Sequence, residues 1–232
     1  GPGAGTPPVD ALKSRPDLKP PYLNVKTPGT NASPGKFFYA PAQYGMSIAD
    51  NFGRMNWFRP VSFGGKGDRI TNFQRQELNG RPVLTYWKGA NTVQGFSQVG
   101  NYEILNAKYN RIYKFGPGNG YKADLHDFEI TPRGTALVLA YRGVKKDLSK
   151  YGGDADGKVL DGIVQEVDLK TGAVLFEWHS LGNIGLGAPI PGAGPQPGAP
   201  WDYVHLNANH SDGGGVLISA RNTSSIYRVK RA

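Results

Sequence analysis

The sequence has no cysteine, few charged residues and no long apolar segment. Without cysteine the chain can form no disulfide bonds or thiolate metal sites, and its cellular compartment stays open. No apolar run approaches the roughly 18 residues of a membrane-spanning helix, so we expect no membrane span. The sequence also lacks the glycine-rich phosphate loop, the dinucleotide fingerprint and the Gly-x-Ser-x-Gly elbow, and we predict no cofactor.

Glycine and proline, in contrast, are abundant. The chain contains 33 Gly and 18 Pro residues, and each Gly or Pro inside a helix costs ~1 or ~3 kcal/mol relative to Ala. This excludes a helical bundle and disfavours a doubly wound α/β domain. Aromatic residues make up 11% of the chain and supply apolar surface for a core. We predict an all-β protein whose many short strands are joined by tight turns.

Basic residues outnumber acidic ones, which gives a formal net charge of +9. This balance favours anionic partners such as nucleic acids, anionic lipids and sulfated or phosphorylated substrates. The basic residues are scattered, however, and the densest runs, Lys145–Lys146 and Arg228–Arg231, are short. We therefore expect no nucleic-acid partner.

Composition divides the chain into two parts. Residues 1–35 hold eight of the prolines, and we predict that they form an extended arm on the surface of a domain, with little regular structure. Residues 36–232 consist of short apolar runs separated by turn residues, as in a succession of β-strands. Asn79-Gly80, between two such runs, is a strong hairpin signal.

A unit of glycine turn, strand, hairpin and strand recurs in the second part. The stretch from His126 to Tyr141 resembles the stretch from His205 to Arg221, about 80 residues later. Repeats of roughly 40–80 residues with this content are typical of β-propeller blades. We count about three blades and part of a fourth, and a closed ring needs at least about four complete blades. We therefore expect an incomplete ring, which a second chain or a further segment completes.

Two of the histidines, His126 and His205, fall at the same stage of this repeat, near the start of a blade's innermost strand. Innermost strands line the central channel of a propeller, so both side chains are expected to face one cavity. The alternative is that each ring is simply held by a neighbouring carboxylate, Asp127 or Asp202. Two histidines so far apart, with no His-x-His pair or carboxylate cluster, predict no metal site.

Three further polar residues have side chains that could bind an anion or a proton. Arg221 ends an apolar strand where the equivalent strand has Tyr141, and a guanidinium can hold an oxyanion with two hydrogen bonds. An ordinary salt bridge would explain this arginine equally well. We expect His179 to be a surface residue and His210 to be solvated within a polar turn over residues 209–212.

Seven segments, in order along the chain, resemble the arylsulfotransferase (arylsulfate sulfotransferase) family, and above all its actinobacterial and fungal branch. They are Arg15–Pro21, Pro82–Gly89, Asp124–Phe128, Thr131–Leu137, Gln165–Asp168, Trp201–Asn207 and Ile218–Ser224. The resemblance extends from about Arg15 to Val229, nearly the whole chain.

The resemblance implies an exported, six-bladed β-propeller that moves a sulfuryl group from an aryl sulfate donor to a phenolic acceptor. Family members use no phosphoadenosyl sulfate and work by ping-pong transfer through a sulfated histidine. By the same resemblance His126, His205 and Arg221 are catalytic and Asn207 binds substrate. The nucleophilic histidine corresponds to a segment after Ala232, so the chain corresponds to the N-terminal portion of the family's fold.

Two other functions stay open. The missing nucleophile and the scattered basic charge also fit a non-catalytic propeller that binds an anionic ligand or a protein partner. Exposed aromatic residues would suit a sugar- or cell-wall-binding propeller, with Trp57, Trp87 and Trp201 as candidates. The first residues lack an initiator Met, which fits an exported protein whose leader has been removed, and we expect a secreted or periplasmic location.

Overall fold

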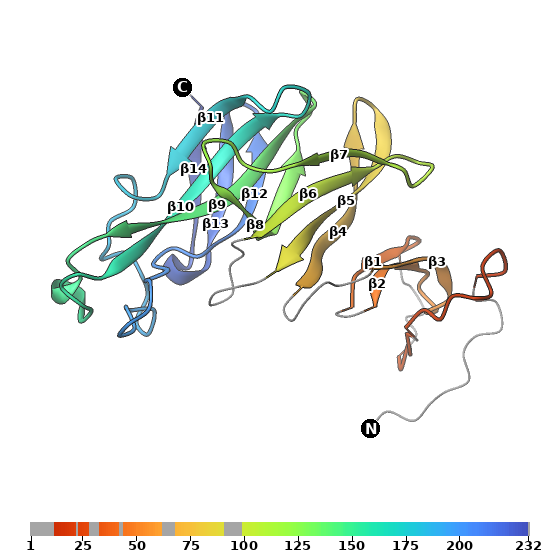
Figure 1. The fold of residues 1–232 in the computed structure, drawn as a ribbon, viewed down its shortest axis with the longest axis horizontal. Helices are drawn as coiled ribbons and strands as arrows, with labels where there is room; N and C mark the ends of the chain where they lie inside the picture. The colour runs from red at the N-terminus through yellow and green to blue at the C-terminus, as the bar shows by residue number, and fades with distance from the viewer. Residues whose placement is uncertain are drawn as a thin grey trace.

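The computed structural model describes residues 12–21, 23–27, 33–41, 44–61, 68–90 and 99–231. Within these ranges the chain is all-β, and its strands form four small antiparallel sheets (Figure 1). The first sheet contains β1 (Phe37–Tyr39), β2 (Gly45–Ala49) and β3 (Met55–Pro60). The second contains β4 (Asp68–Leu78), β5 (Arg81–Ala90), β6 (Val99–Leu105) and β7 (Arg111–Phe115).

The third and fourth sheets complete the described fold. The third contains β8 (Lys122–Ile130), β9 (Thr135–Lys145), β10 (Lys158–Asp168) and β11 (Val174–His179). The fourth contains β12 (Leu206–Asp212), β13 (Gly215–Ala220) and β14 (Ser225–Lys230). Two single-turn 3-10 helices, η1 (Ser149–Tyr151) and η2 (Arg221–Thr223), lie in connections. No helix in the described ranges is long and apolar enough to cross a membrane.

Strand order in every sheet follows sequence order, because each strand pairs with the next along the chain. The turn between β4 and β5 shows why a strand pairs with the next one along the chain. Asn79 and Gly80 both adopt positive φ, at 51° and 71°, which is the conformation of a type I′ hairpin turn. The hairpin predicted from this dipeptide is confirmed.

The sheets pack face to face, with apolar cores between them. One core lies between the third and fourth sheets, and a second lies between the second and third. Strand β8 contacts both β4 and β12, so the first strands of three consecutive sheets lie side by side. This arrangement is consistent with propeller blades, and it places the two repeats that contain His126 and His205 next to each other.

Part of the predicted arm, residues 1–11, 22 and 28–32, lies outside the described residues. The described remainder of residues 12–35 contains turns and bends but no strand or helix. In one of these turns the Arg15 N–H donates to the Leu12 carbonyl at 2.8 Å, and in the next the Leu18 N–H donates to the Arg15 carbonyl at 3.1 Å.

Two sequence predictions about local structure are wrong. Residues 209–212 do not form a turn, because they belong to β12, which pairs with β13 from Leu206 to Asp212. The second concerns the exposed aromatic residues, since Trp87 is fully buried and Trp201 is only 5% exposed. Both rings pack in the apolar cores, so neither can serve as a platform for sugars.

Candidate functional site

The first strands of the second, third and fourth sheets are each interrupted by a shift in register. The shifts lie between Thr71 and Gln74, between Ala123 and Phe128, and between Leu206 and Ala208. Such irregularities break the ladder locally and re-aim side chains. Both His126 and Asn207 lie within them, and His205 directly precedes β12. The local backbone therefore explains why polar side chains gather along these strands.

Polar contacts join one irregular segment to the next. The Asp127 carboxylate accepts from Asn72 Nδ2 at 3.1 Å and from the backbone N–H of Asn209 at 3.0 Å. Asp127 thus links β8 to both β4 and β12. Burial raises the pKa of Asp127 above its ordinary value, and the hydrogen bond from Asn209 opposes only part of that effect.

His126 is held by a buried carboxylate from its own strand. Its Nδ1 lies 2.8 Å from Oδ1 of Asp124, which also accepts from the His126 backbone N–H at 2.9 Å. The Asp124 side chain is fully buried, while 22% of the His126 side chain is exposed. Burial lowers the pKa of His126, but the hydrogen bond and charge of Asp124 raise it by more, so the net pKa is raised. The predicted partner Asp127 was the wrong carboxylate.

His205 is held in the same manner by the predicted partner, Asp202. One carboxylate oxygen contacts Nδ1, and the other accepts from the His205 backbone N–H at 3.0 Å. The backbone of His205 has φ of 50°, a left-handed conformation that is uncommon outside glycine and clusters at functional sites. Its carbonyl accepts from the N–H of Arg221 at 3.0 Å, which fixes this turn of the chain against η2.

The structure brings the two histidines into contact. Their ring centroids lie 4.9 Å apart and the rings are nearly perpendicular, at 78°. The prediction was that both histidines face one cavity, and this geometry supports their proximity, although neither ring lines either of the two cavities described below. The alternative prediction, that each ring is held by a nearby carboxylate, agrees as well, so the two were not exclusive. Only His126 is appreciably exposed, since His205 is 4% exposed.

Asn207 and Arg221 lie beside this pair in different ways. The Asn207 side-chain oxygen is buried and has no hydrogen-bond partner among the described residues. The Arg221 side chain is exposed, and its Nε donates to Asn222 Oδ1 at 3.1 Å. Arg221 lines a cavity of about 550 Å³ together with Asp202. Neither histidine lines that cavity, but two of its lining residues bind His205: Asp202 through its carboxylate and Arg221 through its backbone N–H.

The other two histidines lie elsewhere. His179, predicted to be a surface residue, is three-quarters buried, with Nδ1 2.7 Å from Asp161 and Nε2 2.8 Å from Glu177. Its position at the end of β11, where it pairs with Ile163 of β10 and its side chain reaches the buried Asp161 two residues away, accounts for the difference. His210 has a side chain that is 69% exposed, and it pairs with Glu129 at 2.8 Å.

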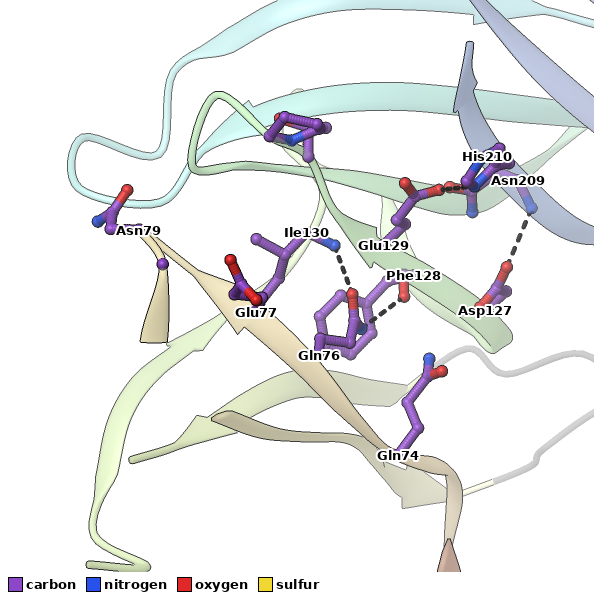
Figure 2. Close-up of a pocket in the computed structure, with 13 residues that line it drawn as sticks. Gln74, Gln76, Glu77, Asn79, Asp127, Phe128, Glu129, Ile130, Asn209 and His210 are labelled. Atoms are coloured by element: carbon purple, nitrogen blue, oxygen red, sulfur yellow. Dashed lines mark hydrogen bonds and ion pairs between the residues drawn. The ribbon is translucent and has the colours of Figure 1, made fainter. Parts of the chain in front are cut away.

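A second cavity, of about 530 Å³, lies over β4, β8 and β12 (Figure 2). Its polar lining groups largely bind one another. Gln76 accepts from the Ile130 N–H at 2.7 Å and donates to the Phe128 carbonyl at 3.1 Å. The Glu129 side chain points to His210, and Asp127 to the backbone of Asn209 (Figure 2). These contacts hold three neighbouring strands together, which is a structural role.

Sequence reasoning missed Asp124 as the partner of His126. The available signal was the spacing of two, because an aspartate side chain often accepts a hydrogen bond from the backbone two residues on, as Asp124 does from His126. It also missed Asn72 and its left-handed backbone, with φ of 52°. No motif in the sequence indicated that residue.

Comparison with known proteins supports the relationship inferred from the seven segments. A family model described as Arylsulfotransferase (ASST) matches residues 74–232, from within β4 to the end of the fourth sheet. The first of the seven segments, Arg15–Pro21, lies outside this match. No curated protein matches the chain. The match covers more than half of the chain and includes both histidines, Asn207 and Arg221, and the chain therefore belongs to the arylsulfotransferase (ASST) family.

Proposed function

We propose that this protein takes part in the transfer of a sulfuryl group from an aryl sulfate to a phenolic acceptor. In this proposal the four sheets are consecutive blades of a six-bladed propeller, and a further segment or a second chain supplies the remaining blades. Family membership supports the reaction class, and the stacking of β4, β8 and β12 supports the architecture. An exported location is part of the same proposal.

The observation that carries the proposal is the pair of histidines in contact, each held by its own aspartate at Nδ1. A ring held at Nδ1 presents Nε2 on its other side, so each histidine has one nitrogen directed away from its carboxylate. Because Asp124 raises the pKa of His126 above its ordinary value, the protonated ring is favoured, and it could donate its proton to a sulfuryl oxygen or a leaving phenolate. Arg221 adds a fixed positive charge nearby.

The reaction has two steps. In the first, a nucleophilic histidine forms an N–S bond while the S–O bond to the donor phenol breaks, and the departing phenolate takes a proton from an acid such as His126. In the second, the acceptor phenol gives its proton to the His126 ring, which was deprotonated in the first step, while its oxygen attacks sulfur and the N–S bond breaks, which frees the nucleophilic histidine. The family resemblance assigns the nucleophile to a histidine outside this chain. His126, His205, Asn207 and Arg221 would then bind the sulfuryl oxygens, whose negative charge requires donors and cations.

The test is transfer from 4-nitrophenyl sulfate to phenol by the full-length protein, followed as release of nitrophenolate. We expect turnover, and we expect His126→Ala and Arg221→Ala each to lower kcat/KM by about 10²-fold or more. His210→Ala is the matched control, since His210 is exposed and does not contact the pair. Absence of turnover, or variants indistinguishable from the wild type, would refute the proposal.

A second candidate is a non-catalytic propeller that binds an anionic ligand, and the charge of +9 favours it. Intact-mass analysis after incubation with the donor separates the two. A histidine adduct of about 80 Da, the mass of a sulfuryl group, is expected of covalent transfer and is not expected of simple binding. Binding of the donor without an adduct and without turnover would favour the second candidate.

A further inference from the structure

The connection between β11 and β12 is a long segment, rich in glycine and proline, that is held in place at several points. The Ile190 N–H donates to the Asn222 carbonyl at 2.9 Å. Trp201 donates through its backbone N–H to the Lys158 carbonyl at 2.8 Å and through Nε1 to the Ala193 carbonyl at 2.7 Å. These contacts fix Ile190 against η2, which contains Arg221, and Trp201 against β10.

The cavity of about 550 Å³ that contains Arg221 is formed by this segment. Its lining includes the apolar residues Ile190, Pro191, Ala199 and Pro200 and the charged residues Arg221 and Asp202. The volume lies within the range of about 300–1,000 Å³ that small-molecule sites occupy. A cavity lined by both apolar residues and a cation suits a ligand that has an aromatic ring and an anionic group.

The charge of Arg221 has no carboxylate partner among the described residues. The acidic residue that lines the cavity, Asp202, is already bound to Nδ1 and the N–H of His205. The side chain of Arg221 donates through Nε to the neutral amide of Asn222. The terminal nitrogens of a guanidinium suit the oxygens of a tetrahedral anion.

Ile190 supplies the apolar end. It is one of the exposed large apolar side chains, with 45% of its surface accessible. Its N–H is bound to the carbonyl of Asn222, the residue after Arg221, so the backbone of Ile190 is held next to η2. Ile190 and Arg221 line the same cavity, so one ligand could pack its ring on Ile190 and reach Arg221 with its sulfate.

We propose that residues 190–201 form the aryl-binding wall of the site and determine which aryl sulfates are accepted, with Arg221 holding the anionic end. This inference rests on the proposed function, because it names the substrate-contacting segment of the same site. The wall selects by shape and apolar packing, so bicyclic aryl sulfates should be favoured over small alkyl sulfates. Asp202, which lines the cavity, is bound to His205 of the histidine pair.

Binding of a non-reactive analogue tests the wall independently of turnover. Isothermal titration of the full-length protein would use 2-naphthalenesulfonate, which has both an aromatic ring and an anionic group. Inorganic sulfate, which has only the anion, and 2-naphthol, which has only the ring, would be titrated separately. We expect Ile190→Ala to weaken naphthalenesulfonate and naphthol binding by about tenfold, because the variant removes apolar surface on which the rings pack. Sulfate binding should stay unchanged in this variant. We expect Arg221→Gln to weaken the two anions but not naphthol.

Leu175→Ala is the matched control, because Leu175 is 55% exposed on β11 and does not line the cavity. If naphthalenesulfonate does not bind, or if Ile190→Ala binds it as tightly as Leu175→Ala does, the inference is wrong. If the variants behave as expected and no sulfuryl transfer occurs, the aryl-binding wall stands and the proposed function fails. If transfer occurs and Ile190→Ala leaves KM for aryl sulfates unchanged, the proposed function stands and the wall fails.

Discussion

Replacement of Glu166 should show how the third and fourth sheets are held together. Glu166 lies on β10 with a fully buried side chain, and Arg133 binds both of its carboxylate oxygens at 2.6 Å. It also accepts from the Thr135 hydroxyl and forms an ion pair with Arg231 at 3.1 Å. Arg231 follows β14, so this carboxylate joins the sheet of His126 to the sheet that His205 precedes.

The cost of Glu166→Gln follows from the exposure of its two cationic partners. Removal of one partner from a buried ion pair costs about 3–5 kcal/mol, since the other charge stays buried. The Arg133 side chain is 60% exposed and can return to water, whereas the Arg231 side chain is only 14% exposed. The penalty therefore comes mainly from Arg231, and we expect about 3 kcal/mol. For a chain of this size that change corresponds to a melting temperature lower by about 6–12 °C.

Urea unfolding followed by far-ultraviolet circular dichroism would measure this change. Glu77→Gln is the matched control, because Glu77 is exposed on β4 and such surface changes stay within about 0.5 kcal/mol. Adding Arg231→Met to Glu166→Gln should restore part of the stability, since the uncompensated cation is then gone. If Glu166→Gln costs no more than the control, the ion pairs do not stabilise the packing of the two sheets.

Three further predictions concern single side chains. The raised pKa of His126 means that its bond to Asp124 stabilises the fold fully below about pH 6.5 and loses effect as pH rises through the raised value. Asp124→Asn should therefore lower the free energy of unfolding more at about pH 5.5 than at about pH 8.5. Gly100→Ala should cost about 1–3 kcal/mol or more, because a methyl group would lie 2.1 Å from the buried Trp87 ring. Asn209→Leu should gain about 1 kcal/mol, because neither polar atom of this buried side chain has a partner among the described residues.

Urea unfolding also measures these three effects. An equal effect of Asp124→Asn at both pH values would show that the charge of His126 does not contribute. Gly116→Ala is the control for Gly100, since a methyl group at Gly116 meets nothing within 4 Å, and equal costs would contradict the clash. A lower stability of Asn209→Leu would mean that the amide has a role in the folded protein.

The sequence predicted most strands because short apolar runs lie between clear turn signals. It failed at β12, where Asn209, His210 and Ser211 have the composition of a turn. These residues are strand because they pair with β13, and the backbone N–H groups of Asn209 and Ser211 also donate to Asp127 and Glu129 of β8 at 3.0 Å. The bonds to β8 join residues more than 80 apart in sequence. Such bonds are not visible in a single sequence.

The histidine pair shows which part of a site can be read from sequence. The position of each histidine within the sequence repeat predicted that His126 and His205 occupy equivalent places in two sheets. Because β8 packs on β12, these equivalent places are neighbours in the structure. The sequence repeat does not identify the carboxylate that binds each histidine. Asp124 is two residues from His126 and shares its face, whereas Asp127 points from the strand toward the backbone of Asn209. The tendency of an aspartate to bind the backbone two residues on could have made that assignment. The position of Arg221 relative to the pair could not be assigned, because residues 190–201, with no repeat or period, set the cavity in which it lies.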